Sequence, residues 1–557
     1  MSAVPADPAI SGRSLRRGAD AARATAGRWP LAVAALVALP LVLVLGALAQ
    51  GAFGGDAEVV SHLFRHVVPG VVVDTLVLVA GVALVAGLLG TGLAWLVSTY
   101  DFPLRGFYAW ALLLPLAAPA YVLAFVAIAA LDYAGPVQGW LRTVVGPELR
   151  LPPIRSTGGV ILVMGLALYP YVYLLARGAF ATQGRRALEV AQSLGLSPRQ
   201  AFLRVQLPLA RPWIAGGIAL VAMETLADFG TVAVFNYDTF TTAIYRAWSG
   251  LYSLEAALQL AGLLVVLVAG ALVVEQRARA AQRHTALGGP AADRRRLRGW
   301  RAALATAAPA TVLTVALVLP LIALVSWSAR HAARDLDADY FDAAWRSLLL
   351  GLMAAALVCA LALALAYAVR ARPGAATRAL ARLATLGYAL PGAVLAVGVF
   401  VPVATLNNAF EAVGARLGAD WPFYLQGTFV VLLMAYAARF LAVGHAPVEA
   451  NLGRVTRALD DSARLLGASG LSLVARVHLP LLRAGLLTAA ALVFVDVMKE
   501  MPITLMTRPF GWDTLAVRVF ELTSEGEWTR AALPALAIVL AGLVPVALIL
   551  RRVDRAA

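Results

Sequence analysis

The chain has very little of the chemistry that soluble enzymes use. Among its 557 residues there is one cysteine, Cys359, one lysine, Lys499, and six histidines, and only 14% of the residues are charged. A single cysteine excludes a disulfide framework and a thiolate metal site. A single lysine, followed by Glu500, excludes the Gly-Lys-Ser/Thr phosphate-binding loop of an ATPase anywhere in this chain.

Apolar residues dominate instead. They make up 61% of the sequence, and the mean hydropathy is +0.80, which is typical of a polytopic helical membrane protein. Because a crossing needs about 20 apolar residues, the sequence predicts about twelve spans. Their expected centres are Leu41, Ala83, Ala120, Gly165, Ala222, Leu264, Val315, Ala356, Leu395, Leu433, Phe494 and Val539.

Two polar islands interrupt the apolar chain, at residues 185–208 and 457–480. One offset relates them, since 480 − 208 = 272 and 467 − 195 = 272, so the chain is a tandem duplication. The sequence therefore predicts an all-α membrane protein with two pseudo-symmetric six-helix halves. The expected parts are a basic cytoplasmic tail at 1–28, a first half at 29–275, a cytoplasmic linker at 276–304 and a second half at 305–557.

The net charge of +15 follows the expected topology. If the N-terminus is cytoplasmic, most arginines fall on the cytoplasmic side, as the positive-inside rule requires. This orientation also places the C-terminus and both islands in the cytoplasm. One alternative is open, because Ala47-Leu48-Ala49 resembles a signal-peptidase site and cleavage there would remove the first span.

Each island is predicted to form two short helices around a glycine, Gly195 or Gly467, in the left-handed conformation. Ser197 and Pro198 are expected to cap and begin the second helix of the first island. Pro208 is expected to end that helix, since a proline blocks continuation. Pro119 and Pro391, which also match at the offset of 272, are expected to kink their spans in the middle.

The islands resemble the cytoplasmic EAA loop of binding-protein-dependent ABC importer permeases. Both copies have an acid, an alanine two residues later, a glycine six residues after the acid, and a final Leu-Pro. The resemblance implies a coupling helix that docks in a groove of an ATPase subunit, although Val190, Ser462 and Asp461 depart from the usual pattern. The alternative is an amphipathic cytoplasmic hairpin. The residues concerned are Glu189, Ala191, Gly195, Leu207, Pro208, Asp461, Ala463, Gly467, Leu479 and Pro480.

Ionisable residues at membrane depth are functional candidates, because burying them there costs several kcal/mol. Glu224 lies about 18 Å along the helix from Pro212, which places it near mid-membrane. At the offset of 272, Glu224 matches Asp496 and Asp228 matches Glu500. Three interpretations are open: a structural network, the lining of a translocation pathway, or a substrate site. The five candidates, which do not form a metal coordination sphere, are Glu224, Asp228, Asp496, Lys499 and Glu500.

Two blocks look like the fused permease of ferric-iron ABC importers. They read METLADFGT at 223–231 with TTAIYR at 241–246, and MKEMPIT at 498–504 with a further match over 508–518. The resemblance covers nearly the whole chain and implies the fold of a type I importer permease in a bacterial inner membrane. It also implies two copies of a cytoplasmic ATPase that carries ATP and magnesium, a periplasmic binding protein, no cofactor in this chain and no nucleic acid. Thiamine, polyamine and phosphonate importers have related permeases.

Two other classes of protein are possible. An ion-gradient-driven secondary transporter would use the buried acids for coupling, but the duplicated polar loops do not favour it. A membrane-embedded enzyme would need a histidine cluster, a Ser/His/Asp set or a pair of aspartates at a water interface, and the sequence has no such arrangement.

Overall fold

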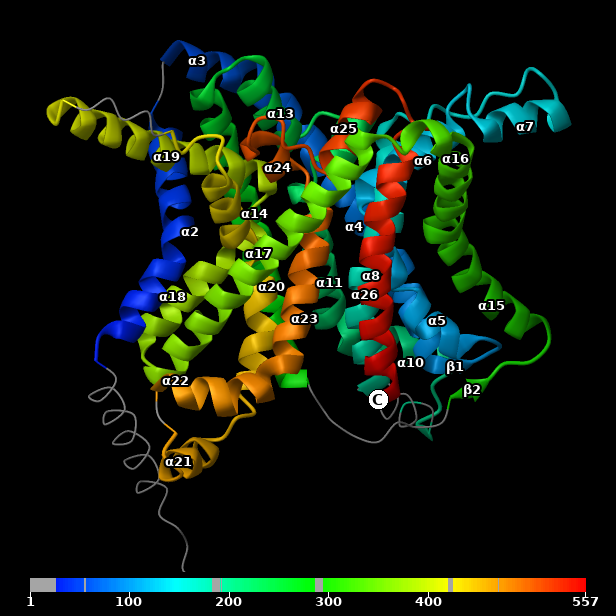
Figure 1. Cartoon of the computed structure of the whole chain (residues 1–557). Helices are drawn as coiled ribbons and strands as arrows, with labels where there is room; N and C mark the ends of the chain where they lie inside the picture. Colours follow the sequence, from blue (N-terminus) through cyan, green and yellow to red (C-terminus); the bar gives the residue numbers. More distant parts are fainter. Residues whose placement is uncertain are drawn as a thin grey trace, which may run out of the picture.

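The computed structural model describes residues 27–54, 57–182, 191, 193–285, 294–418, 424–468 and 470–556. These residues form a helical bundle in which long apolar helices stand side by side (Figure 1). The elements up to residue 285 are α2 (Trp29–Phe53), α3 (Ala57–His62), η1 (Leu63–Val67), α4 (Val68–Thr99), β1 (Tyr100–Asp101), α5 (Arg105–Ala111), η2 (Leu114–Ala117), α6 (Ala120–Leu131), α7 (Pro136–Val145), α8 (Thr157–Thr182), α10 (Pro198–Ala201), η3 (Phe202–Gln206), α11 (Leu207–Ala227), α12 (Gly230–Phe235), α13 (Phe240–Tyr245), η4 (Arg246–Gly250) and α14 (Leu254–Thr285).

After residue 285 the described elements begin with a two-residue strand, and the helices that follow broadly repeat the order of those in the first half. These elements are β2 (Arg295–Arg296), α15 (Trp300–Leu313), η5 (Thr314–Val318), α16 (Leu319–Asp335), α17 (Ala338–Ala371), α18 (Ala375–Thr385), η6 (Leu386–Ala389), α19 (Gly392–Arg416), α20 (Phe429–Leu452), α21 (Arg457–Leu465), α22 (Gly470–Leu473), η7 (Val474–His478), α23 (Leu479–Met498), α24 (Pro502–Thr507), α25 (Leu515–Ser524) and α26 (Ala532–Ala556).

The predicted fold class is confirmed. In the described part of the chain, 11 helices are long and apolar enough to cross a membrane. The twelfth predicted span, centred on Val539, corresponds to α26, where the apolar helical stretch covers only Ala532–Ala547. Helix α14 continues to Thr285, so it extends into the predicted linker at 276–304.

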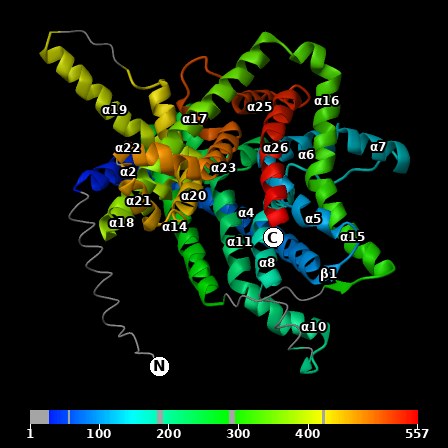
Figure 2. The same cartoon turned by 60° about the horizontal axis from the view of Figure 1, so that its bottom comes forward.

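The internal repeat extends to individual elements. Adding 272 to the bounds of η2, α10, η3 and α12 gives the bounds of η6, α22, η7 and α24. The two halves also interlock, since α2 packs against α17, α18 and α19 of the second half. The short helices of the two islands, α10 and α21 with α22, lie at the same end of the bundle as the C-terminus (Figures 1 and 2).

The prediction that Pro208 ends a helix is wrong. In both islands the short helix continues through a π-helical turn, η3 or η7, into the long helix α11 or α23. The π turn shifts the hydrogen-bonding register so that Pro208 and Pro480 fall in the first turn of the following α-helix, where an N–H is not needed. Each island is therefore joined to a span by one continuous helix.

The prediction that Pro119 and Pro391 kink their spans is also wrong. Both prolines stand at the N-cap position, before α6 and α19, and each follows a short 3₁₀ helix. Because proline is favoured where a helix begins, these residues start the spans and do not bend them.

A short β-pairing holds the described end of the connection between the two halves against the first half. Strand β2 pairs in parallel with β1, and the backbone N–H of Leu297 donates to the carbonyl of Asp101 over 2.9 Å. Nearby, Arg105 donates to the carbonyl of Val97. Burial and the neighbouring charges of Arg294 and Arg177 lower the pKa of Arg105 to about 10.

Candidate functional site

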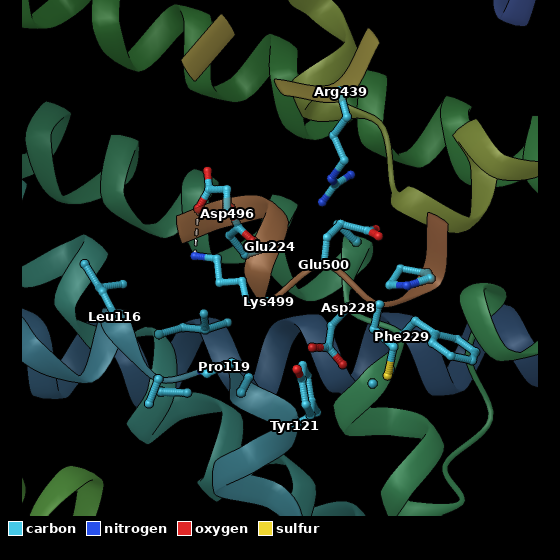
Figure 3. Close-up of a pocket in the computed structure, with 18 of the residues that line it drawn as sticks. Leu116, Pro119, Tyr121, Glu224, Asp228, Phe229, Arg439, Asp496, Lys499 and Glu500 are labelled. Atoms are coloured by element: carbon cyan, nitrogen blue, oxygen red, sulfur yellow. Dashed lines mark ion pairs between the residues drawn. The ribbon is translucent and has the colours of Figure 1, made fainter. Parts of the chain in front are cut away.

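A polar cavity of about 160 Å³ lies where α11 and α23 end. All five ionisable residues that the sequence singles out line it: Glu224, Asp228, Asp496, Lys499 and Glu500. Figure 3 shows the acids of the two halves gathered around one space. The structure therefore brings the predicted residues together, because the two broken helices meet in the middle of the bundle.

Asp228 and Glu500 stabilise the two breaks in the helices, between α11 and α12 and between α23 and α24. Asp228 accepts hydrogen bonds from the backbone N–H groups of Thr231, at 2.9 Å, and Val232, at 3.3 Å. Glu500 accepts in the same way from Ile503 and Thr504, both at 3.1 Å. A threonine hydroxyl adds a further bond to each carboxylate. These bonds satisfy first-turn N–H groups of α12 and α24 that have no partner within the helix.

Asp496 and Glu224 have different surroundings, although they are equivalent in the repeat. Asp496, near the end of α23, forms an ion pair over 2.9 Å with Lys499, the residue that follows the helix. Glu224 accepts a hydrogen bond from the hydroxyl of Tyr171 at 3.3 Å. Of these two equivalent acids, Asp496 is thus paired with a cation and Glu224 faces a phenol.

Four polar side chains of the cavity were not predicted. Arg439 of α20 reaches into it and donates to the backbone carbonyl of Leu390 (Figure 3). Tyr121, Tyr171 and Tyr388 also line the cavity. Arg439 could have been found from the sequence, since it is a charged residue inside the apolar stretch 429–443. The tyrosines could not, because tyrosine is common in apolar spans.

The two islands have the predicted glycine geometry. Gly195 has φ of +85° and Gly467 has φ of +88°, both left-handed. Across each glycine the backbone closes in the same way, with Leu196 N donating to Ala191 O over 3.0 Å and Ala468 N donating to Ala463 O over 2.9 Å. This is the Schellman arrangement that ends a helix. Ser197 caps the next helix through a hydrogen bond from Gln200 N, as expected.

The other predicted island residues lie in several environments. Ala191 and Ala463 are buried, whereas Leu479 is exposed at the surface. Asp461 is exposed and pairs with Arg464 over 3.3 Å. Leu207, Pro208 and Pro480 lie in the first turns of α11 and α23. Glu189 lies outside the described residues.

The buried acid of the second island is Asp460, whereas the loop pattern selects its exposed neighbour Asp461. Its carboxylate accepts from Arg370 over 2.6 Å and lies 2.7 Å from Nε2 of His478. The hydroxyl of Tyr367 lies 2.7 Å from Nδ1 of the same histidine. Burial alone would raise the pKa of Asp460, but the hydrogen bonds from Arg370 and His478 outweigh it and hold that pKa below its usual value. This polar network ties α21 to α17 and η7.

Within the described residues, no group of three or more His, Cys, Asp or Glu side chains is placed to hold a metal ion. The cavity instead combines four carboxylates, two cations and three phenols. Such a chamber can bind a charged solute by hydrogen bonds and by charge. Its position at the meeting point of two broken, symmetry-related helices is typical of transporters.

Comparisons with known proteins agree with this geometry. Residues 86–275 match the family described as "Binding-protein-dependent transport system inner membrane component". The chain is 26% identical to the Fe(3+)-transport system permease protein FbpB 2 of Haemophilus influenzae, over 94% of this chain and 97% of that protein.

Two further relatives match one part of the chain. The chain is 31% identical to a putative 2-aminoethylphosphonate transport system permease protein, PhnV, of Salmonella typhimurium, over 31% of this chain and 73% of that protein. It is 30% identical to a probable sulfate transport system permease protein, cysT, of Nephroselmis olivacea, over 37% and 72%. The chain thus belongs to the binding-protein-dependent transport system inner membrane component family, as a fused permease with both halves in one polypeptide.

Proposed function

We propose that this permease imports ferric iron, driven by ATP hydrolysis in separate cytoplasmic subunits. The observation that carries the proposal is the continuous helix between each island and the cavity. From Pro198 to Ala227 the helix spans about 44 Å without a break. It begins three residues after Gly195 and ends three residues after Glu224. The second half repeats this arrangement from Gly467 to Lys499.

This arrangement supports mechanical coupling. An ATPase bound at Gly195 or Gly467 would move the cytoplasmic end of a continuous helix whose other end carries a cavity residue. If both of these helices moved together, the cavity between α11 and α23 would change its shape and the side of the membrane to which it opens. Bound ATP would favour one state through its different affinity for the two states, since a ligand shifts an equilibrium by that difference alone. Hydrolysis would then return the assembly to the other state.

Ferric iron is the favoured cargo because the ferric permease of Haemophilus influenzae matches both halves of the chain. The phosphonate and sulfate relatives match about one third of it. The cavity also suits a cation better than an anion, since it holds four carboxylates and two basic groups.

The proposed assembly has two copies of the ATPase, one at each island, and one periplasmic binding protein on the opposite face. Both chain ends would be cytoplasmic, and ATP and magnesium would bind in the ATPase alone. Residues 29–275 and 305–557 would each act as one permease half, with 276–304 as the connection.

Cross-linking would test the docking role. In a Cys359→Ala background, Asp461→Cys and Ser197→Cys each place one thiol on an island. We expect a thiol-to-amine cross-linker to join both variants to the ATPase in native membranes. Glu525→Cys is the control and should give no such product, because this exposed residue directly follows α25, which lies at the other end of the bundle (Figure 1). Absence of a product from both islands would contradict the proposal.

A further inference from the structure

Two phenol groups and one carboxylate meet on one side of the cavity. Tyr171 of α8 donates to Glu224 of α11 over 3.3 Å. Tyr388 of η6, from the second half, lines the same cavity and interacts with the same carboxylate. All three side chains are only partly buried by the protein, and their remaining surface adjoins the cavity. Three separate elements therefore converge on one point.

Among the cavity carboxylates, Glu224 is the one for which the described residues supply neither backbone N–H bonds nor an ion pair. Asp228 and Glu500 each accept two backbone N–H bonds, and Asp496 is paired with Lys499. In the described part of the chain no cation lies within ion-pair distance of Glu224. Its hydrogen-bonded neighbour is a neutral phenol, so the carboxylate has capacity for a further ligand.

The two phenols are not required by the shared architecture of the halves. At the offset of 272 the counterparts of Tyr171 and Tyr388 are Val443 and Leu116, which have no hydroxyl. A phenylalanine would fill the same space without a polar group that needs a partner in the bundle. Their presence beside Glu224, on one side only, indicates a role for the hydroxyl oxygens themselves.

We propose that Tyr171, Tyr388 and Glu224 form a transit site that binds a ferric ion in the cavity. The inference rests on the proposed function, since it takes ferric iron as the cargo. Binding releases one proton from each phenol to water, because a phenol ligates a ferric ion as the phenolate. Two phenolates and one carboxylate then carry three negative charges against the three positive charges of the ion. A neutral set is what a low-dielectric site tolerates best. Water or an accompanying anion completes the coordination.

Visible absorption tests the site, because a phenolate bound to a ferric ion has a charge-transfer band. The full-length permease with its ATPase, but without the binding protein, is titrated with ferric nitrilotriacetate. We expect the band in the wild type, a weaker band in each single variant, Tyr171→Phe or Tyr388→Phe, and its loss when both are combined. Tyr436→Phe is the matched control, since that hydroxyl bonds to Thr504 outside the cavity lining and the band should persist.

Uptake measured in parallel separates this inference from the proposed function. We expect the double variant Tyr171→Phe, Tyr388→Phe to lose about tenfold or more of ATP-dependent ferric uptake, the scale seen when contacts around a metal are removed. Absence of the band in the wild type, its persistence in the double variant, or undiminished uptake would overturn the site. If the wild type transports iron in any of these cases, the proposed function stands; if it does not, that proposal fails separately.

Discussion

The Nε2 atom of His478 lies 2.7 Å from Oδ1 of Asp460, and this contact joins the second island to the start of the long helix α23. Arg370 holds the other oxygen of the same carboxylate at 2.6 Å. The counterparts of these residues in the first half are Gln206, Leu188 and Ser98, so the network belongs to one half only. The two islands therefore share a backbone shape but differ in how they are held.

Replacing Asp460 with asparagine should weaken this network. Loss of the charged hydrogen bonds to Arg370 and His478 should cost about 2 kcal/mol, which a lower thermal unfolding temperature would report. We expect the ratio of uptake to ATP hydrolysis to fall as well. The control is Asp461→Asn, whose exposed ion pair should contribute little. Equal effects of the two substitutions would contradict this assignment.

The depressed pKa of Asp460 also gives a pH dependence. A carboxyl whose pKa is lower in the folded protein than in the unfolded chain stabilises the fold above the ordinary aspartate pKa. That contribution is lost as the pH falls through the lowered value. The wild type should therefore lose stability relative to Asp460→Asn on acidification below the ordinary aspartate pKa. Parallel unfolding curves for the two proteins over that range would argue against the network.

Valine at Gly195 or Gly467 should uncouple hydrolysis from uptake. The left-handed φ costs a residue with a side chain about 1–2 kcal/mol, so the Schellman turn should open. Among the described residues, apart from the chain neighbours, no atom lies within 4 Å of a Cβ at either position, so the strain comes from the backbone and not from a clash. Gly92→Val, at an equally open helical position, should retain coupling. Insertion into the membrane should be normal in all three, and normal uptake by both island variants would be inconsistent with a docking role.

The ion pair of Lys499 and Asp496 allows a test of charge balance. Lys499→Met should leave the Asp496 carboxylate without its partner and destabilise the protein by about 2 kcal/mol, less than for a fully buried pair because both side chains are partly exposed. The double variant with Asp496→Asn should recover most of that stability. A double variant as unstable as the single one would mean that Lys499 acts through another contact.

Three of the four cavity acids should divide into two classes. Asp228→Ala and Glu500→Ala remove acceptors from the first turns of α12 and α24, and each should lower stability by roughly 1–2 kcal/mol. Glu224→Gln keeps the shape of the side chain and the bond from Tyr171, so it should reduce uptake while the unfolding temperature changes little. The division would fail if Glu224→Gln were the least stable variant.

The sequence predicts those features that depend on local chemistry or on the repeat. The offset of 272 places Glu224 with Asp496 and Asp228 with Glu500, and the glycine positions of the islands follow from backbone sterics. It does not predict the environment of equivalent residues. Asp228 and Glu500 hold backbone amides because the helices break beside them, and that break depends on how the two halves meet.

Other differences between prediction and structure have physical causes too. Pro208 does not end a helix, because a π turn places it where its missing N–H is harmless. Asp461 fits the loop pattern, but Asp460 is the buried acid, since a shift of one position on a short helix changes the face that a side chain occupies. Tyr171 and Tyr388 come from distant segments, and their meeting at Glu224 depends on packing.

Uptake by the reconstituted assembly tests the central claim most directly. The permease, its ATPase and the binding protein are placed in proteoliposomes, and entry of radiolabelled ferric iron is measured with ATP, without ATP, and with an ion gradient alone. We expect uptake to require ATP and all three components and to be indifferent to the gradient. Uptake by this chain alone, driven by an ion gradient and unaffected by ATP, would contradict the account.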